Sequence, residues 1–374
     1  MLLSNPCDPD PRVLNEAEAL VEAGNQVKIV AWDRELKSPS KQKINGVEIE
    51  RLRLKSTYSR GFSQIVGFLR FNFSAFRKLI KSDFDVVHCH DFDTLPAGFF
   101  AANLKKKKLV YDSHEYYSAL MKDHTLNLVS NAVLWFESFV LKKADLVIVV
   151  NDSIKHKFIS RGANHVNLIL NSKNLKDYKK IKKSQIDAYK NKFKIGKKKI
   201  LLYIGTFAPN RNLLEIIDLV KGRKDIVLII GGEGVLENEI KRKAKLYPNI
   251  IFLGKVPESR VPFFTKLADI NLAVYKSNYL NNLIAGPPNK LFESIAAGTP
   301  ILTSKDGVTG KLVQRLGCGI VVNPEEILDI QEKLFGLLKN QKKYFSIKNQ
   351  IKKIQPEFDW QKEKLKLVKL YERL

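Results

Sequence analysis

The stretch GPPNKLFESIAAGTPILTS, residues 286–304, contains a complete helix-to-strand unit. Its two prolines favour a helix start because their φ angles are already helical, and Gly298 and Pro300 end the helix before the strand ILTS. The first turn of a helix carries free backbone N–H groups and a partial positive charge. Because Lys290 adds a cation there, the stretch predicts an anion site, for which phosphate is the commonest ligand.

A carboxylate follows in the same helix. Glu293 lies three residues after Lys290, so both side chains project from one face. A carboxylate next to a bound phosphate is repelled by it, so its presence there suggests another role. Accepting hydrogen bonds from two hydroxyls of a sugar is such a role. An amphipathic helix with a local Lys290–Glu293 ion pair explains the same residues, and this stretch alone does not decide between the two interpretations.

Strand and helix patterns alternate along the rest of the chain in two series. Such alternation is typical of parallel sheets with crossover helices, so we predict an α/β fold with two Rossmann-like domains joined near Asn171. Ligands of such sheets bind beyond the carboxyl ends of the strands. The expected strands lie at residues 26–32, 85–90, 108–113, 145–150, 200–206, 226–232, 250–256, 270–276, 300–304 and 319–323.

Glycines and charged residues follow four consecutive strand ends in the second series. Gly205 precedes Arg211, whose guanidinium suits a pyrophosphate, and Gly231 and Gly232 would let a base or ribose approach the backbone. Each motif is weak alone, but together they indicate a nucleoside diphosphate. The candidate donor-binding residues are Gly205, Arg211, Gly231, Gly232, Glu233, Lys255, Val256, Asn289, Lys290 and Glu293.

The chain has 374 residues and a formal net charge of +25. The length suggests two domains, and the charge favours nucleic acid, anionic lipid or phosphorylated substrates as partners. Residues 151–200 hold 15 basic and three acidic side chains, and the simplest interpretation is a solvated segment beside a domain junction. Because these lysines lack the aromatic interleaving of stacking platforms, we expect no nucleic-acid partner.

The cysteines and the hydropathy of the chain indicate the cellular compartment in which the protein is expected. Cys7, Cys89 and Cys318 are too scattered for a disulfide framework or a zinc site, so a reducing compartment is expected. No apolar run approaches about 18 residues, so no transmembrane helix is expected, and no signal peptide precedes the first motif. Residues 1–4 allow only a very short first strand, which leaves open whether the true start lies upstream of Met1. The protein is expected in the cytoplasm.

The segment 58–80 predicts a helix with one broad apolar face. That face is expected to be core, and Phe71 is expected on the outer face among basic residues. An exposed phenylalanine among basic residues suits an interfacial helix, although a surface helix with one stray aromatic explains it as well. We expect this domain to dock on the anionic inner face of a membrane. The expected core face comprises Phe62, Ile65, Val66, Leu69, Phe73, Phe76 and Ile80.

Nearly the whole chain resembles the family 4 glycosyltransferases of the GT-B fold, in the group with a PNKLFE-type donor motif. The resemblance implies an acceptor-side domain at 1–170, a nucleotide-sugar domain at 171–354 and a last helix at 355–374 that crosses back, with the two sheets facing across a cleft. The matching segments are SNPCDPDPRVLNEAEALVEAGNQV, DVVHCHDFDTLPAG, VYDSHEYY, YIGTFAPNRNL, IIGGEG, FLGKV, PPNKLFESIAAGTPILTS, GCGIVVNP and FDWQKEKLKLVKLYERL.

The resemblance also implies a reaction. It is hexosyl transfer from a nucleoside-diphosphate sugar, with retention at the anomeric carbon and without metal or cofactor, to a lipid-linked or polysaccharide acceptor in surface glycan synthesis. By position, Arg211 and Lys290 face the diphosphate and Glu293 the ribose. The implied catalytic residues are His114, toward the donor sugar, and Glu293. The implied acceptor-side residues are Asp10, Arg12, His90 and Asp91.

Two positions depart from the family pattern. Ala285 stands where many members carry a glutamate against the donor sugar, and Thr206 follows Gly205 where many carry an arginine. Lys290 of the PNKLFE form can replace the lost cation. The residue that steadies the sugar therefore stays open, as do the nucleotide, the sugar, the acceptor, the linkage and the oligomeric state.

Other functions were weighed against transfer. The tripeptide DFD, residues 91–93, looks like the metal-binding motif of GT-A glycosyltransferases, but nothing else fits that fold, and no metal site is expected. A sugar-nucleotide epimerase shares the GT-B fold, and a basic nucleic-acid-binding protein would explain the charge. Product analysis with and without acceptor separates transferase from epimerase, and salt-dependent oligonucleotide binding identifies the third class.

Overall fold

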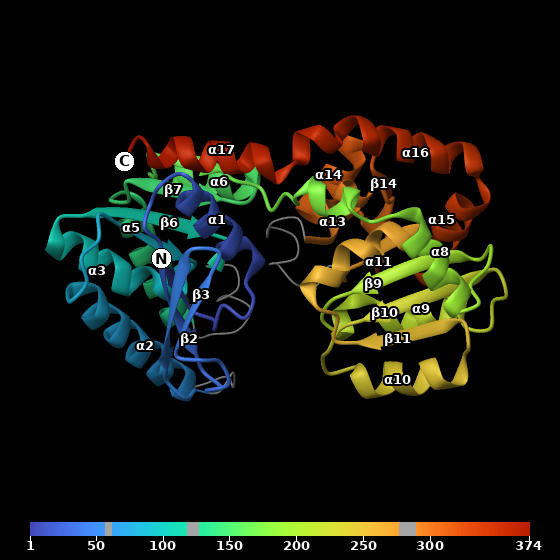
Figure 1. The fold of residues 1–374 in the computed structure, drawn as a ribbon, viewed down its shortest axis with the longest axis horizontal. Helices are drawn as coiled ribbons and strands as arrows, with labels where there is room; N and C mark the ends of the chain where they lie inside the picture. Colours follow the sequence, from blue (N-terminus) through green and yellow to red (C-terminus); the bar gives the residue numbers. More distant parts are fainter. Residues whose placement is uncertain (57–61, 118–126, 277–288) are drawn as a thin grey trace. The chain divides into compact units, whose positions relative to one another are not determined.

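A computed structural model describes residues 1–56, 62–117, 127–276 and 289–374, without the side chains of 62–64 and 127–129. Contacts between residues divide the chain into two units. The first comprises residues 1–170 and 363–374, and the second comprises residues 171–362. Each unit contains one sheet with helices packed against it, as predicted for an α/β fold (Figure 1).

The sheet of the first unit has the order β3-β4-β2-β1-β5-β6-β7-β8. Every neighbouring pair is parallel except β3 and β4, which form a hairpin through Asn45 and Gly46 at φ angles of 47° and 86°, as a type I′ turn requires. The central strands are buried along their length because helices cover both faces. The strands are β1 (Leu2–Leu3), β2 (Lys28–Asp33), β3 (Lys41–Ile44), β4 (Val47–Arg53), β5 (Val86–His90), β6 (Lys108–Ser113), β7 (Leu146–Val149) and β8 (Val166–Leu168).

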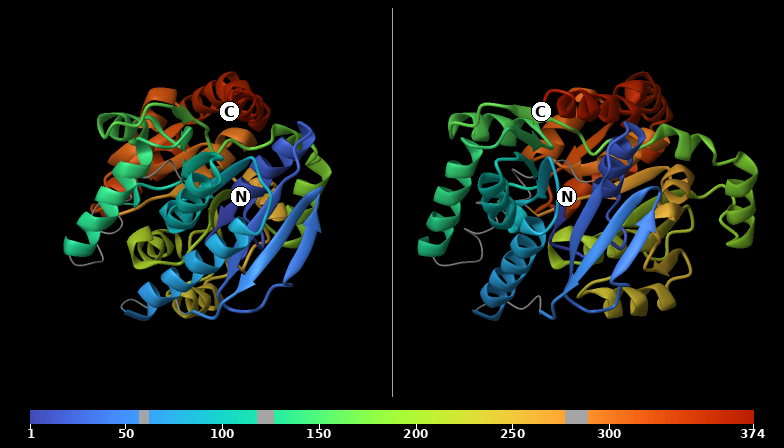
Figure 2. Two further views of the ribbon diagram at one scale, coloured as in Figure 1. Left: turned by 90° about the vertical axis from the view of Figure 1, so that its left-hand side faces the viewer. Right: turned by 60° about the vertical axis from the view of Figure 1, so that its left-hand side comes forward.

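Helices complete two hydrophobic cores in this unit. Helices α2, α3, α5 and α6 contribute to one core, and α1 packs its Val13 and Ala17 into the other. In both views of Figure 2, α2, α3 and α5 run side by side, and stacked or edge-on phenylalanines join α3 to α5. The helices are α1 (Pro11–Glu22), α2 (Phe62–Ile80), α3 (Leu95–Lys105), α5 (Asn127–Leu141) and α6 (Asp152–Ser160), with a short turn η1 (Phe92–Thr94).

The faces of α2 differ from those predicted, although Phe76 and Ile80 of the expected core face do pack against the core. Phe71 is fully buried and stacks on Trp32 at a ring distance of 4.7 Å, whereas Leu69 and Phe73 of the expected core face are 59% and 61% exposed. Small residues explain the choice: a Cβ at Gly67 would overlap the hydroxyl of Ser56, and Ala75 is buried, so this side of the helix can approach the sheet closely. The prediction was wrong because α2 is apolar on nearly every side.

The sheet of the second unit has the order β11-β10-β9-β12-β13-β14, and all its pairs are parallel. Counted within the unit this is 3-2-1-4-5-6, the order of dinucleotide-binding folds, in which the ligand crevice lies where the order reverses, here between β9 and β12. The strands are β9 (Lys199–Ile204), β10 (Ile226–Gly231), β11 (Ile250–Gly254), β12 (Ile270–Ala273), β13 (Ile301–Ser304) and β14 (Gly319–Val322).

The helices of the second unit mostly follow the strands as crossovers. They are α7 (Leu175–Lys179), α8 (Lys183–Lys192), α9 (Leu213–Val220), α10 (Glu237–Leu246), α11 (Val261–Leu267), α13 (Asn289–Ala297), α14 (Gly307–Leu316), α15 (Ile327–Lys339) and α16 (Gln341–Ile354), with the short turns η2 (Pro209–Arg211), η3 (Glu258–Arg260) and η4 (Gln355–Phe358). In the described part of the chain no helix is long and apolar enough to cross a bilayer.

The chain returns to the first unit in α17 (Trp360–Tyr371), and the return begins at residue 363 instead of 355. Gln355 explains the difference, since its side-chain amide donates to the carbonyl oxygens of Ile295 and Ala296 and so caps α13 of the second unit. From residue 363 on, Glu363 is buried and accepts a hydrogen bond from Leu170 N at 3.0 Å.

Candidate active site

Backbone hydrogen bonds join the ends of β9, β10 and β11. Gly205 N donates to Gly231 O at 2.9 Å, and Gly232 N donates to Gly254 O at 2.7 Å. A Cβ at Gly232 would overlap the carbonyl oxygen of Gly205, and one at Gly234 would overlap the backbone of Phe207. The glycines of YIGT and IIGGEG are therefore needed for the loops to pack together at the carboxyl end of the sheet.

Two cations lie on aromatic rings at this end of the sheet. The ammonium of Lys290 is 4.7 Å from the ring centre of Tyr203, and the guanidinium of Arg211 is 4.2 Å from that of Tyr275. Lys290 also reaches Gly205, where a Cβ would lie 2.7 Å from its Nζ. A cation on an aromatic face is held in place without a carboxylate partner, so both charges remain available to an anion.

Lys290 keeps its charge although it is partly buried. Burial alone would lower the pKa of its ammonium group, but Tyr275, Tyr203 and Glu293 raise that pKa above its ordinary value. Within residues 1–56, 62–117, 127–276 and 289–374, neither Lys290 nor Arg211 has a carboxylate within 4.0 Å, and Nε of Arg211 has no hydrogen-bond partner. This arrangement suits a diphosphate.

Glu293 lies in the middle of α13 and is 7% exposed. It forms no ion pair with Lys290; instead Lys173 Nζ lies 3.9 Å from its carboxylate, 3.8 Å from Glu258 and 3.2 Å from Oδ1 of Asn289. Burial raises the pKa of Glu293, and Lys173 and Lys290 partly oppose the rise. Among the described residues no donor hydrogen-bonds to this carboxylate, so it can accept bonds from a ligand.

The other expected donor-binding residues are exposed or partly exposed. Glu233 and Lys255 pair with each other at 3.0 Å and are 62% and 77% exposed, and the side chain of Val256 packs on Gly231. Asn289 is the first residue of α13. The two prolines at 287–288 and Ala285 lie outside the described residues.

A second cluster forms around Asp112 at the end of β6 in the first unit. Arg12 Nη2 lies 3.0 Å from Oδ1 of Asp112 and 3.1 Å from Oε1 of Glu16, which follows Arg12 by one turn of α1. His114 Nε2 lies 3.1 Å from Oδ2 of Asp112. Both carboxylates are fully buried, so these pairs operate where water does not screen them.

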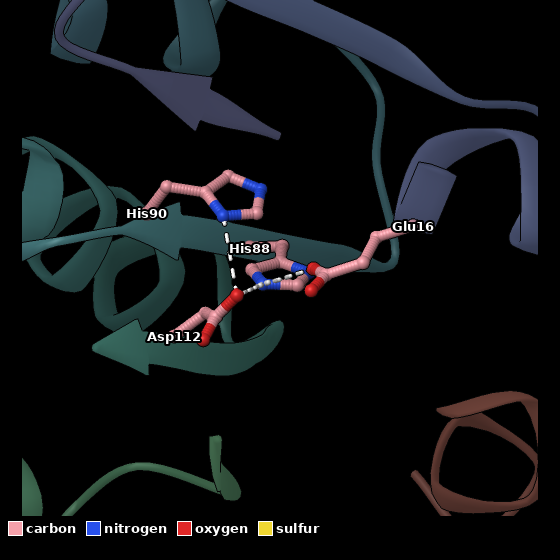
Figure 3. A group of neighbouring side chains, drawn as sticks. All are labelled: Glu16, His88, His90 and Asp112. Atoms are coloured by element: carbon pink, nitrogen blue, oxygen red, sulfur yellow. Dashed lines mark ion pairs between the residues drawn. The ribbon is translucent and has the colours of Figure 1, made fainter. Parts of the chain in front are cut away.

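Three histidines surround this carboxylate. Glu16, His88, His90 and Asp112 point toward one another from α1, β5 and β6 (Figure 3). His88 and His90 stack with ring centres 4.2 Å apart, and His90 Nδ1 lies 3.2 Å from His114 Nε2. Within the described residues, Nε2 of His88 and Nε2 of His90 are buried without a hydrogen-bond partner.

Asp91 holds His114 from the other side. Its carboxylate accepts a hydrogen bond from His114 N at 2.8 Å and lies 3.4 Å from His114 Nδ1. Asp91 adopts a φ of 60°, which non-glycine residues rarely do. Such local strain at a strand end is common where a side chain must be aimed at a ligand.

The cluster balances its charges internally. Burial would lower the pKa of His114, but Asp91 and Asp112 raise it to about 9. Burial would raise the pKa of Asp112, but Arg12 and His114 hold it well below its usual range. Burial raises the pKa of Asp91 to about 6. At pH 7 His114 is therefore cationic between two carboxylates that are mostly ionised.

One group of side chains in the described part of the chain could hold a metal ion: Glu16, His88, His90 and Asp112. The guanidinium of Arg12 already lies against both carboxylates, so a cation would have to displace it. In the DFD tripeptide, Asp91 binds His114 whereas Asp93 accepts from Tyr117 and Ser4, so the two carboxylates serve different partners. Neither arrangement favours a metal over the ion pairs present.

The expected acceptor-side residues divide into two groups. Arg12, His90 and Asp91 belong to the Asp112 cluster, whereas Asp10 caps α1 by accepting from Val13 N at 3.2 Å. Sequence reasoning missed several members of the two sites. These are Glu16, His88, Asp112 and Tyr371 in the first unit and Lys173, Tyr203 and Tyr275 in the second.

Two family models match this chain, one in each half. The model described as Glycosyltransferase Family 4 matches residues 12–175, and the model described as Glycosyl transferases group 1 matches residues 185–354. A Bacillus subtilis protein named as glycosyltransferase YtcC is 24% identical over 204 residues, 49% of each chain. The uncharacterized glycosyltransferase MJ1607 of Methanocaldococcus jannaschii is 25% identical over 329 residues, which are 83% of this chain and 79% of that protein.

Solved structures with the same fold cover the whole chain. Sucrose-phosphate synthase of Thermosynechococcus elongatus has a TM-score of 0.78 at 16% identity, covering 100% of this chain and 98% of that one. HepE of Anabaena, solved in complex with UDP-glucose, has a TM-score of 0.73 at 16% identity, covering 100% of this chain and 99% of that one. The likeness establishes the GT-B fold. The alignment spans only half the length of YtcC.

Proposed function

Since this chain is a glycosyltransferase of the GT-B, family 4 type, we propose that it transfers a hexose from a nucleoside-diphosphate sugar to a lipid-linked or polysaccharide acceptor in surface glycan synthesis. The observation that carries the donor assignment is the group of charged side chains at the carboxyl end of the sheet in the second unit. There, Arg211 and Lys290 lie on tyrosine rings, with no carboxylate of a described residue within 4.0 Å, and the buried carboxylate of Glu293 follows Lys290 by one turn of α13. HepE binds UDP-glucose, so uridine sugars are the first donors to test.

The proposed chemistry assigns one task to each group. Arg211, Lys290 and the first turn of α13 stabilise the negative charge that develops on the departing diphosphate. Glu293 accepts hydrogen bonds from the ribose, and protonated His114 holds a hydroxyl of the donor sugar. The anomeric configuration is retained, and the cations that the leaving group needs come from side chains instead of a metal.

A panel of UDP-, GDP- and ADP-sugars in a thermal-shift assay tests the donor. A ligand at 100 times its dissociation constant stabilises a protein by about 2.7 kcal/mol, which such an assay detects. Product analysis with and without an acceptor then separates a transferase from an epimerase. The proposal fails if no sugar nucleotide shifts the unfolding temperature.

Replacing Glu293 by alanine is expected to weaken donor binding by about ten- to hundredfold. A hydrogen bond to a charged group contributes roughly 1.5–3 kcal/mol, and the side chain has no other hydrogen-bond partner to lose within the described residues. Isothermal titration with the donor measures the effect. Glu258→Ala is the matched control, because Glu258 lies equally close to Lys173 but is half exposed; near-normal affinity in Glu293→Ala would refute the ribose assignment.

Transfer is expected to be unaffected by EDTA. Two side-chain cations face the expected diphosphate position, and Arg12 occupies the oxygens that a metal would need in the first unit. Initial rates with EDTA, and after adding manganese back, check this. Loss of activity that manganese restores would assign a metal to the group of Glu16, His88, His90 and Asp112.

We further propose that the first unit docks on the anionic inner face of a membrane, where lipid-linked acceptors reside. Eight large apolar side chains are exposed on the adjacent helices α2, α3 and α5, far more than scattered surface residues require. Exposed basic residues, Arg70 and Arg77 of α2 and Lys142 and Lys143 after α5, accompany them. We call this surface the α2–α3–α5 face; it comprises Ile65, Val66, Leu69, Phe73, Phe100, Leu104, Trp135 and Phe139.

A further inference from the structure

The last helix brings one hydroxyl into the buried cluster of the first unit. The hydroxyl of Tyr371 lies 2.6 Å from Nδ1 of His88, a residue that is 1% exposed. Two other residues of α17 hold the helix in the same unit: Leu367 is fully buried, and the buried carboxylate of Glu363 accepts from Leu170 N. The hydroxyl is therefore delivered by a packed helix and not by a loose end of the chain.

We propose that Tyr371 is a positioning residue for sugar transfer: its hydroxyl donates to Nδ1 of His88 and so directs the Nε2–H of that ring toward Asp112 and Glu16. The effect on turnover rests on the proposed transferase function, whereas the effect on the His88 ring does not. Tyr371 does not touch the reacting groups in this proposal. It acts through His88.

The direction of the hydrogen bond follows from the surroundings of both groups. Burial raises the pKa of Tyr371 well above its ordinary value, so the hydroxyl keeps its proton. Burial lowers the pKa of His88, so its ring is neutral and carries one N–H. Nε2 of His88 lies 3.8 Å from Oδ2 of Asp112 and 3.9 Å from Oε2 of Glu16. A lone pair aimed at the ionised carboxylate of Asp112 would be repelled, whereas an N–H is attracted.

The ring of His88 in turn supports the residues that face the substrate. It stacks on His90 at 4.2 Å, and His90 Nδ1 contacts His114 Nε2 at 3.2 Å. Asp112, which faces His88 Nε2, also binds His114. A change in the His88 ring therefore reaches His114 by two routes, through the stacked ring and through the shared carboxylate.

Tyr371→Phe tests the proposal because it removes the hydroxyl and keeps the aromatic ring. Loss of the hydroxyl leaves Nδ1 of His88 buried without its hydrogen-bond donor. The preference of the ring for carrying its proton on Nε2 is then weaker. We expect turnover to fall about tenfold, equivalent to about 1.4 kcal/mol, with the donor KM unchanged. In the 1H–15N spectrum of histidine-labelled protein, we expect one His88 state with the proton on Nε2 before the substitution and more than one after it.

Tyr111→Phe is the matched control. Tyr111 is another buried tyrosine of the first unit, and its hydroxyl donates to Glu137 at 2.8 Å, away from His88. This variant is expected to lose some stability while keeping turnover and the His88 signals. The His88→Gln variant assigns those signals.

Three results would overturn the proposal. They are wild-type turnover in Tyr371→Phe, a proton on Nδ1 of His88 in the unsubstituted protein, and a loss of turnover matched by a rise in donor KM with an unchanged spectrum. If no sugar nucleotide is turned over by the unsubstituted protein, the proposed function fails separately. The spectrum alone then decides whether Tyr371 orders the His88 ring.

Discussion

Replacing His114 by alanine is expected to lower turnover by about a hundred- to a thousandfold while leaving nucleoside-diphosphate affinity nearly unchanged. Removing one preorganised donor that faces developing charge costs roughly this much in other enzymes. His114 belongs to the first unit, whereas Arg211, Lys290 and Glu293 of the expected nucleotide site belong to the second. The nucleotide therefore keeps its own contacts in the variant.

The pH dependence follows from the same residue. Its pKa is raised to about 9, so the cation is present at neutral pH and is lost as pH rises through about 9. Turnover should be constant between about pH 7 and 8 and should fall above about 9. The contribution of His114 to folding stability has the same sign: it is complete below the unfolded value of about 6.5 and is lost as pH rises toward about 9.

Two further variants make the test decisive. His114→Ala leaves Asp91 and Asp112 short of a cation and will lower the unfolding temperature, so His114→Gln, which keeps a donor without the charge, is measured beside it. His156→Ala replaces an exposed histidine of the same unit and should behave like wild type. A parallel loss of nucleotide affinity and turnover in His114→Ala would place the residue outside the proposed role.

Most strands of both sheets were predictable because short β-branched runs recur between helical segments, and parallel strands buried on both faces need such runs. The three-residue strand β8 (Val166–Leu168) was not expected. The hairpin of β3 and β4 was missed although its signal is present: Asn45-Gly46 between polar-apolar alternations predicts a type I′ turn. The GT-B fold expected from the resemblance is confirmed by structures that cover the whole chain.

The sites were predictable only where residues belong to a local sequence pattern, at a strand end or in the first turns of a helix. Lys290 and Glu293 fall in that class. Tyr371 does not, since it lies 283 positions from His88, and no local pattern connects the two. Tyr275, whose ring contacts the guanidinium of Arg211, likewise follows a strand in a segment whose sequence shows no sign of a binding role. Such partners are selected by tertiary packing, and only the fold identifies them.

The buried and exposed sides of α2 were predicted incorrectly, and this changes which side chains are proposed to contact the membrane. Periodicity placed the wider apolar stripe in the core, but the sheet instead accepts the side with Gly67, Phe71 and Ala75, where small residues permit close packing. Part of the predicted stripe is therefore left on the surface, namely Ile65, Val66, Leu69 and Phe73. Phe71 stacks on Trp32 and is unsuitable for testing membrane binding, since Phe71→Ser would damage the core.

A variant of the α2–α3–α5 face with Leu69→Ser, Phe73→Ser, Phe100→Ser and Trp135→Ser is expected to bind anionic vesicles about a thousandfold more weakly than wild type. These side chains are 59%, 61%, 54% and 69% exposed, so the substitutions remove little from the core. Full burial of a large apolar side chain contributes about 1.5–3 kcal/mol. At half that burial each contributes roughly 1 kcal/mol, and about 1.4 kcal/mol corresponds to tenfold.

Vesicle sedimentation measures the effect and separates it from general surface hydrophobicity. The matched control carries Val235→Ser, Leu246→Ser, Leu328→Ser and Phe345→Ser in the second unit, at side chains that are 81%, 66%, 74% and 57% exposed. It should sediment like wild type. Binding of wild type should require anionic lipid and weaken with salt, because each basic residue near the surface contributes about 1 kcal/mol that salt screens.

The same variants decide whether another molecule occupies this face. If wild type self-associates, fails to bind vesicles, and becomes monomeric only in the α2–α3–α5 variant, the face is an interface between copies of the chain and the membrane proposal is wrong. If the variant sediments like wild type, these helices are not the membrane contact. Loss of sedimentation in this variant alone, with donor binding unchanged in the second unit, is the result we expect, since a bilayer accepts apolar side chains and anionic headgroups accept the neighbouring arginines and lysines.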